Sequence, residues 1–457
     1  MNFAQLKKEI IDQDLCTRCG TCIGVCPQEA LYLSDVLGKC IPAINGNVDE
    51  ICVECPAPCI TGCPGKEVDF PALNDFVYGS QPENYLIGHT INHYIGYASN
   101  PDIRKRGSSG GIISAVLDYL LRERHIDVVL TLIDNPDKPL QPEPVIIRDP
   151  EKLIKAAQSK YSLAPVNTIL RKTLEEEGNY AYVGLPCQIH SIRKLQMQND
   201  PNVKNISLLI GSYCGNIHHF TSVIDFLKKF GVEDLNLVKR IQYRAGEWPG
   251  KLLVTLKDGR EFGLPKFYAN YMNMLYIVKR CQVCTDLSNE FADFSGADAW
   301  APKYEERGKG YSLITTRTAI GDKIIKECLE NNILISEQQV EKKEVLTMHS
   351  HTIDNKKIGA KVRMELWKLF SKDIPVYNLR MVGLPKLRLI LSIAVAAAFA
   401  LGSTKSMKKI ISILPMNMTG KAFAFFRKKW KGISRPKGIS SGYSFEPESY
   451  TSTDQFL

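Results

Sequence analysis

The sequence predicts a mixed α/β fold in three parts: a small cysteine-rich N-terminal domain, an α/β domain and a basic helical tail. Two closely spaced cysteine runs fill the first part, and strand–turn–helix units follow one another through the second. Lysines and arginines without acidic residues dominate the third. We expect the parts to span residues 1–75, 85–350 and 351–457, because a linker of Gly, Ser, Gln and Pro lies at 79–82.

The first cysteine run extends from Cys16 to Cys26 and is closed by Pro27. Its spacing of two, two and three residues is that of bacterial ferredoxins, in which the thiolates bind a 4Fe-4S cluster. A second run, from Cys52 to Cys63, has one additional residue before its third cysteine. The fourth cysteine of such a run ligates the other cluster. We therefore predict one cluster at Cys16, Cys19, Cys22 and Cys63, and a second cluster at Cys52, Cys55, Cys59 and Cys26.

Disulfides and zinc are the alternatives for these thiols. The N-terminal residues MNFAQLKKEI lack the apolar segment of a secretory signal, so we expect a reducing, cytoplasmic location in which disulfides are rare. Structural zinc sites combine CxxC pairs at wider separation than the ferredoxin-type run. The spacing therefore favours iron–sulfur clusters.

A basic, glycine-rich loop precedes a predicted helix in the α/β region. Residues 104–111 read RKRGSSGG, and an apolar stripe follows from Ile112 to Leu121. Glycines leave backbone amides accessible, serines cap helices, and a helix N-terminus favours an anion. An ordinary capped helix start is the alternative to a site for the phosphates of a nucleotide cofactor. The predicted cofactor-binding residues are Ser108, Ser109, Gly110 and Gly111.

Standard nucleotide-binding motifs are missing from the sequence. The chain contains neither GxGxxG nor GxxxxGK(S/T), which argues against a standard dinucleotide fold and against a P-loop.

Three short apolar segments, 128–133, 180–183 and 206–210, are predicted to be buried strands. The second and third are followed by Cys187 and Cys214, respectively. Ligands of open α/β sheets bind at the carboxyl ends of the strands. Both cysteines are therefore expected at one ligand-binding edge.

A hairpin with an Asp258-Gly259 turn is predicted next, followed by an aromatic helix from Phe267. That helix ends at the pair Cys281 and Cys284. Together with the two cysteines after the strands, this pair makes a set of four. In number, four thiolates suit a third 4Fe-4S cluster and a zinc ion equally. Because the N-terminal cysteine runs already predict 4Fe-4S clusters, we favour a third 4Fe-4S cluster over zinc for this set.

The α/β region carries a series of ordered motifs. They are Gly107-Ser-Ser-Gly-Gly111, Tyr182-Val-Gly-Leu-Pro-Cys187-Gln188, Gln242-Tyr-Arg244 with Trp248-Pro-Gly250, Cys281-x-x-Cys284-x-Asp286, and Ala292-Asp293 with Gly296-Ala-Asp298-Ala-Trp300. In this order they resemble the family of coenzyme F420 hydrogenase/dehydrogenase beta subunits over about residues 85–350, with a ferredoxin module in front. The family often has Gly-Ser-Lys-Tyr where this chain has Gln158-Ser-Lys-Tyr161.

The resemblance implies an iron–sulfur flavoprotein oxidoreductase. Such an enzyme passes electrons between 4Fe-4S clusters and FAD to a hydride or electron acceptor, either coenzyme F420 or another conjugated substrate. It implies an α/β flavin-binding catalytic domain, in which the loop at 108–111 binds the flavin phosphate. Lys160 is then a charge partner for the phosphate or for the reduced flavin. Asp286 and Asp298 are predicted to orient groups or handle protons, although carboxylates in such turns more often cap the backbone.

Two other functions stay open at this point. One is a non-catalytic electron-transfer subunit, and the other is a membrane-associated component of surface-polysaccharide biosynthesis, since bacterial relatives resemble proteins of such gene clusters. In each case we expect a redox partner protein, and we expect the chain to form a homo-oligomer.

The net charge of +9 is concentrated in the tail, because residues 374–445 contain no Asp or Glu. Residues 389–402 are almost wholly apolar but shorter than the ~20 residues of a spanning helix. Residues 380–437 are predicted to contact a membrane surface peripherally at its inner face, to dock a partner protein, or to pack on the catalytic domain. Nucleic acid is a weaker candidate partner for this segment, because the sequence contains no recognised nucleic-acid-binding motif. The final stretch is predicted to be disordered.

Overall fold

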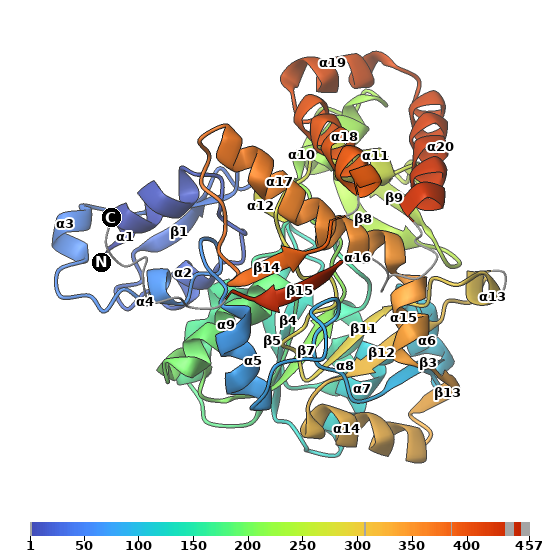
Figure 1. Cartoon of the computed structure of the whole chain (residues 1–457). Helices are drawn as coiled ribbons and strands as arrows, with labels where there is room; N and C mark the ends of the chain where they lie inside the picture. The colour runs from blue at the N-terminus through green and yellow to red at the C-terminus, as the bar shows by residue number, and fades with distance from the viewer. Residues whose placement is uncertain (1, 306–307, 385, 435–442, 449–457) are drawn as a thin grey trace.

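The computed structural model describes residues 2–305, 308–384, 386–434 and 443–448. At its centre is an eight-stranded mixed sheet with the strand order β13-β3-β12-β11-β7-β6-β4-β5 (Figure 1). The strands are β3 (His93–Ala98), β4 (Val128–Ile133), β5 (Glu143–Ile147), β6 (Tyr180–Gly184), β7 (Ile206–Ser212), β11 (Phe294–Asp298), β12 (Ser312–Thr316) and β13 (Leu334–Gln339). The three strands predicted from apolar segments are therefore confirmed as β4, β6 and β7.

The four central strands run parallel, in the order β11, β7, β6 and β4, and antiparallel strands complete both edges. Residues such as Leu130, Ala181 and Ile210 are fully buried in them. A parallel sheet covered on both faces requires near-continuous apolar strands, which accounts for the unbroken apolar runs in the sequence. The parallel arrangement also brings the carboxyl ends of these strands to one edge.

Helices cover both faces of this sheet. The apolar stripe of α7 packs with α14 against one face, through residues such as Val116 and Ile325. On the other face, α9 and α5 pack through residues such as Ile192 and Phe70. The helices around the sheet are α5 (Phe70–Tyr78), α6 (Pro101–Arg106), α7 (Ile112–Arg122), α8 (Pro150–Leu153), α9 (Pro186–Met197) and α14 (Ala319–Glu330). Cys328 of α14 is fully buried.

The N-terminal cysteine runs form a separate small module. Its elements are α1 (Phe3–Leu6), α2 (Thr21–Gly24), β1 (Leu31–Ser34), β2 (Ile41–Ile44), α3 (Val48–Ile51) and α4 (Pro58–Thr61). The module docks closely on the sheet domain, because a Cβ on Gly24 would lie 1.9 Å from the carbonyl oxygen of Asn167. Arg280 Nε also donates to the Gly65 carbonyl at 2.8 Å. These contacts place the cysteine runs beside the sheet domain.

A second, three-stranded sheet flanks the main one in the order β10-β9-β8. It comprises β8 (Val238–Ala245), β9 (Lys251–Leu256) and β10 (Glu261–Pro265), and β9 with β10 confirms the predicted hairpin. The neighbouring helices are α10 (Thr221–Lys228), α11 (Asn270–Leu275), α12 (Lys279–Gln282) and α13 (Pro302–Glu305). The single helix expected from Phe267 to Arg280 is thus two shorter helices, α11 and α12.

The remaining elements follow β13 in the chain. They are α15 (Lys342–Met348), α16 (Ser350–Lys356), α17 (Ile358–Leu369), β14 (Leu379–Val382), α18 (Lys386–Gly402), α19 (Lys405–Ile413), α20 (Met416–Ser434) and β15 (Ser444–Pro447). The expected boundary at 351 falls inside α16, where Ile353 is fully buried. Strand β15 pairs antiparallel with β14. The prediction of a disordered final stretch is wrong where β15 forms, and the rest of that stretch lies outside the described residues.

In the described part of the chain, no single helix is both long and apolar enough to cross a membrane. Taken together, Arg388–Gly402 of α18 and Lys405–Ile413 of α19 have the length and composition for a crossing, but the pair is bent by 78°.

Candidate functional site

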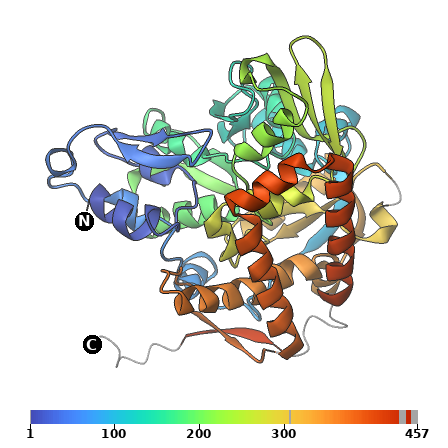
Figure 2. The ribbon, with the colours of Figure 1, turned by 90° about the horizontal axis from the view of Figure 1, so that it is seen from above.

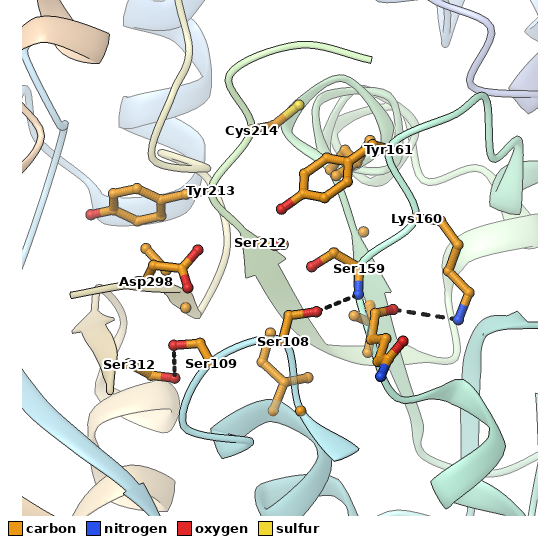
Figure 3. A pocket seen from close by; sticks show the side chains of 18 of the residues that line it. Ser108, Ser109, Ser159, Lys160, Tyr161, Ser212, Tyr213, Cys214, Asp298 and Ser312 are labelled. Atoms are coloured by element: carbon orange, nitrogen blue, oxygen red, sulfur yellow. Dashed lines mark hydrogen bonds between the residues drawn. The ribbon is translucent and has the colours of Figure 1, made fainter. Parts of the chain in front are cut away.

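A cavity of about 340 Å³ opens at the carboxyl ends of β4, β6, β7 and β11. Figure 3 shows Ser108 and Ser109 at one end of this cavity, Cys214 at the other, and Tyr161, Tyr213 and Asp298 between them. This is the edge at which the sequence predicted a ligand. We call it the edge pocket, and its volume lies within the range of small-molecule sites.

The loop before α7 is pinned to the neighbouring strand β12 and to residue 159. The Ser108 hydroxyl accepts from the Ser159 amide at 2.6 Å, and the Ser109 hydroxyl donates to the Tyr311 carbonyl at 2.7 Å. The Gly110 amide donates to the Ser312 hydroxyl at 2.9 Å. The Gly110 amide is therefore occupied, whereas the first amides of α7 have no partner within the helix, and Ile112, Ile113 and Ser114 line the pocket there.

Gly110 has a packing role in this loop. It is buried and does not line the edge pocket, and a Cβ there would lie 2.6 Å from the Gly96 carbonyl oxygen. Of the four residues predicted to bind a cofactor, Ser108, Ser109 and Gly111 line the pocket. Gly110 instead allows the loop to approach β3.

Lys160 lines the same pocket, and its side chain is almost completely buried. Its Nζ lies 3.3 Å from Asp134 Oδ1 and donates to the Ala157 carbonyl at 3.2 Å. Burial lowers the pKa of Lys160, and Asp134 opposes that effect. The ammonium group is thus held at the wall of the pocket by a carboxylate and backbone carbonyls.

Asp298 is bound by a neighbouring arginine. Arg244 donates to both of its oxygens, at 2.8 and 3.1 Å, and Trp248 Nε1 donates at 2.6 Å. Burial would raise the pKa of Asp298, but Arg244 holds it below its ordinary value. A carboxylate in a two-point ion pair is a poor proton carrier. Of the two roles predicted for Asp298, this geometry favours the orienting one.

Tyr161 is the group that this ion pair orients. Its hydroxyl accepts from Arg244 Nη1 at 2.9 Å, and Lys266 Nζ lies 3.5 Å from the centre of its ring. Burial would raise the pKa of Tyr161, but Lys266 and Arg244 lower it below its ordinary value. Sequence reasoning did not select Tyr161, Arg244 or Lys266 as site residues. Tyr161 and Arg244 lie within motifs described in the sequence analysis, and membership of those motifs was the signal that could have identified them.

A second, smaller cavity lies next to the edge pocket and is lined by four cysteines. They are Cys187, Cys214, Cys281 and Cys284, the set that the sequence predicted as a third ligand group. Burial raises the pKa of Cys214 to about 12, with the Cys281 and Cys284 thiols acting in the same direction. Four thiols in a buried cavity are a chemically suitable donor set for a metal cluster. We call this the thiol cavity.

All four thiols line the same cavity. Within residues 2–305, 308–384, 386–434 and 443–448, no group of three or more His, Cys, Asp or Glu side chains is arranged to hold a metal ion, and this applies to the N-terminal cysteines as well. The arrangement of the side chains therefore does not decide between a 4Fe-4S cluster and zinc.

Three charged residues also line the thiol cavity, namely Arg280, Asp286 and Lys356. Burial would lower the pKa of Lys356, but the thiols of Cys284, Cys214 and Cys281 raise it above its ordinary value. Asp286 is fully buried and accepts from His190 Nε2 at 2.8 Å and from the amides of residues 289 and 290. Asp286 therefore caps its own loop beside the thiols and does not line the edge pocket.

The structure brings the N-terminal thiols together in two groups. Burial raises the pKa of Cys63 to about 12, and the thiols next to it are Cys19 and Cys16. Burial likewise raises the pKa of Cys59 to about 12, with Cys55, Cys26 and Cys52 beside it. The fourth cysteine of each run thus lies with the other run, in the exchanged arrangement expected of two-cluster ferredoxins.

The three thiol groups and the edge pocket form a continuous series. Thr17 and Pro64 of the N-terminal module line the thiol cavity, and the Cys187 thiol is close enough to Cys19 for that residue to raise its pKa. Cys214 lines both the thiol cavity and the edge pocket. A ferredoxin-like module, a third set of thiols and a cofactor-sized pocket in series define the class of iron–sulfur redox proteins.

Within that class, the chain belongs to the family of coenzyme F420 hydrogenase/dehydrogenase beta subunits. The model of the N-terminal region of that family matches residues 93–171, and the C-terminal model matches residues 177–342. A 4Fe-4S binding domain matches residues 9–32. The predicted family and its ferredoxin module are therefore confirmed.

The named relatives are oxidoreductases or parts of them. The coenzyme F420-dependent sulfite reductase of Methanocaldococcus jannaschii is 28% identical over 352 residues, which are 73% of this chain and 49% of that protein. The chain thus spans about half the length of this relative. One component of the F(420)H(2) dehydrogenase of Methanosarcina mazei is 27% identical over 325 residues, 69% of this chain and 82% of the relative. The prediction of an oxidoreductase is confirmed at the level of the family.

A solved structure shares the fold. A chain of the F420-reducing NiFe hydrogenase complex from Methanosarcina barkeri superposes with a TM-score of 0.51 at 21% identity, covering 65% of this chain and 98% of that chain. The predicted mixed α/β architecture is confirmed by this likeness and by the sheet described above.

Proposed function

We propose that the chain is an iron–sulfur flavoprotein that passes electrons between its N-terminal clusters and an acceptor of the coenzyme F420 type. The observation that carries the proposal is the position of Cys214, which lines both the thiol cavity and the edge pocket. The proposed order is the Cys52, Cys55, Cys59 and Cys26 group, then the Cys16, Cys19, Cys22 and Cys63 group, then the thiol cavity, and finally the edge pocket.

A third 4Fe-4S cluster is the proposed occupant of the thiol cavity. One observation supports it over zinc: the adjoining module, which also lines this cavity, is of the ferredoxin type. Lys356 among the thiols would offset part of the negative charge of a thiolate-bound cluster. Buried thiolates without such compensation are unfavourable, because burial penalises the charged form.

FAD is the proposed occupant of the edge pocket. The amides at the start of α7 suit a phosphate, and Lys160 supplies a positive charge at the wall. When bound, a flavin takes up two electrons together and releases them singly, which couples a hydride acceptor to one-electron clusters. Tyr161, held by Arg244, presents its hydroxyl beside this pocket for orienting a bound ring.

Filling the mouth of the edge pocket tests this assignment. Ala157 lines the pocket, so Ala157→Trp is expected to lower the flavin content of anaerobically purified protein about tenfold, a loss equivalent to ~1.4 kcal/mol of binding. Ala319→Trp, an exposed position in α14, is the matched control. Flavin released by denaturation is quantified by fluorescence. Wild-type protein that carries iron but no flavin would leave only an electron carrier.

The acceptor is proposed to be anionic. A larger cleft of about 1150 Å³ adjoins the edge pocket and shares Gly107, Ser108, Ser109, Ala157 and Gln158 with it. Its exposed cations are Lys105, Arg106, Lys155, Lys239, Arg240, Lys257 and Lys309. The acidic residues on its walls are Asp102, Asp134 and Glu247, and Asp134 is paired with Lys160. Such a predominantly basic cleft attracts and orients a negatively charged substrate.

Reversing charge in this cleft gives a second test. The triple variant Lys239→Glu/Arg240→Glu/Lys257→Glu is expected to raise the KM for coenzyme F420 by about tenfold or more at low salt, because like charges repel in the cleft. Lys323→Glu, an exposed site on α14, serves as the single-charge control. Added salt should narrow the difference between the triple variant and the wild type. A KM unaffected by the three reversals would show that the cleft does not take the acceptor.

The electron donor is proposed to be a partner protein. The names of several relatives identify them as subunits of larger enzymes, which supports such a partner. Cys52 and Cys55 are only partly buried, whereas Cys63 alone is partly buried in the other N-terminal group, so of these two groups the one farther from the edge pocket is the more accessible to a partner. The relatives favour neither a non-catalytic carrier nor a role in polysaccharide biosynthesis.

A further inference from the structure

From Leu389 onward, the exposed side of α18 is wholly apolar. Between residues 389 and 401, the exposed side chains are Leu389, Ile390, Ile393, Ala394, Ala397, Ala400 and Leu401. Ile390 and Leu401 are 63% and 61% exposed. A helix on the surface of a globular protein normally turns charged or polar residues toward water. The outward face of α18 therefore lacks the composition of a hydrated surface.

Helices α19 and α20, which follow α18 in the chain, also expose both apolar and basic residues. Ile413 is 76% exposed and Phe426 is 67% exposed, and Met418 and Phe425 are also exposed. The exposed cations on these two helices are Lys405, Lys409, Lys421, Lys428 and Lys429. No Asp or Glu occurs anywhere in residues 374–445. The surface is therefore positively charged as well as apolar, and we call it the outer helical face.

The three helices are held in place from beneath. Figures 1 and 2 show α18, α19 and α20 as a U-shaped frame on one side of the molecule. Arg388 donates to Asp354 of α16 at 2.6 Å, Lys408 lies over the Tyr276 ring, and Arg427 lies over the Phe267 ring. Some of the cations thus anchor the frame on the core, while the exposed lysines are open to solvent.

We propose that the outer helical face binds the surface of an anionic lipid bilayer. Apolar side chains flanked by lysines fit a boundary between acyl chains and negatively charged headgroups. Nucleic acid would satisfy the lysines but would leave the apolar side of α18 in water. A second copy would bring two positively charged faces together, which charge repulsion disfavours. The bend of 78° between α18 and α19, and the packing of both on the core, suit a segment that lies on a membrane.

Flotation of the full chain with vesicles tests this proposal independently of redox activity. The vesicles are phosphatidylcholine with or without phosphatidylglycerol. Wild-type protein is expected to float with the anionic vesicles and to dissociate as salt is added. Lys421→Gln/Lys428→Gln/Lys429→Gln should lower the partition coefficient about a hundredfold, given the known contribution of each cation near an anionic surface. Lys152→Gln/Lys172→Gln/Lys323→Gln, which removes three exposed lysines elsewhere, is the control.

The apolar contribution is tested separately. Ile390→Ser/Ile413→Ser/Phe426→Ser should weaken binding at least about tenfold, whereas Ile320→Ser/Ile335→Ser, at exposed sites of α14 and β13, should not. Equal binding of wild type and both triple variants would overturn the proposal, as would failure of the wild type to float with anionic vesicles. A wild-type dimer that dissociates on Ile390→Ser/Ile413→Ser/Phe426→Ser, without vesicle binding, would identify a second copy as the occupant instead.

Discussion

Replacing Cys281 and Cys284 by serine is expected to lower the iron content of the anaerobically reconstituted chain from about twelve to about eight atoms. These two thiols are half of the four cysteine thiols that line the thiol cavity, and a cubane cluster needs four ligands. The N-terminal groups do not include them, so the clusters at 16–63 should persist. Iron is counted by colorimetric analysis against protein concentration, and the remaining clusters are followed by their visible absorption.

The matched control is the double variant Cys40→Ser/Cys328→Ser. Both of these thiols are fully buried, but neither lines the thiol cavity. This control should keep about twelve irons. If the Cys281→Ser/Cys284→Ser protein also kept twelve irons, the assignment of a third cluster would be wrong. Loss of a single zinc ion in place of four irons would select the zinc alternative.

Removing Lys357 is expected to destabilise the fold by about 3–5 kcal/mol, because it leaves a buried charge without its partner. Lys357 Nζ lies 2.6 Å from Glu290 Oε1, and the two side chains are 1% and 2% exposed. The other carboxylate oxygen of Glu290 has no hydrogen-bond partner among the described residues. Lys357→Met should therefore shift the urea denaturation midpoint strongly downward.

Neutralising Glu290 as well tests whether its unpaired buried charge causes the loss of stability. Lys357→Met/Glu290→Gln should recover much of the lost stability, since the uncompensated charge is gone. Failure of the double variant to recover would point to packing by the lysine side chain. The wild type should also lose stability as pH rises from about 4.5 to 7. Burial raises the pKa of Glu290 from 4.5 to about 7, so only the folded state keeps that proton in the window. Glu290→Gln should flatten this dependence.

Periodicity and spacing predicted those parts of the molecule that depend on neighbours in the chain. The strands β4, β6 and β7 are continuous apolar runs, and the hairpin around Asp258 carries its own turn signal. The position of Cys187 and Cys214 follows from a general property of parallel sheets, whose carboxyl ends share one edge. Strands β3, β12 and β13 were not predicted, because their pairing joins segments more than 200 residues apart.

The network around Tyr161 depends on contacts that spacing does not encode. Arg244 reaches Tyr161 across 83 positions and Asp298 across 54 positions of the sequence. Lys356 likewise meets the thiols from a helix that was expected to lie outside the catalytic domain. A lysine or arginine in a sequence normally indicates a solvated surface, and burial with a partner becomes visible only in three dimensions.

The basic cleft was not predicted, because the positive and negative charges outside the tail nearly cancel in the sequence. The excess charge of the sequence lies in the tail, and the remainder of the chain is close to neutral. In the fold, Lys105, Lys155, Lys239 and Lys257 gather on one cleft although they come from separate elements. Net charge by segment therefore indicated the outer helical face and missed the cleft.

Counting iron and flavin in one anaerobic preparation of the full chain is the most direct test of the account. Three thiol groups in series with the edge pocket predict about twelve iron atoms and one flavin per chain. Eight irons without flavin would contradict it, because the thiol cavity and the edge pocket would then both lack the groups on which the proposed electron path depends.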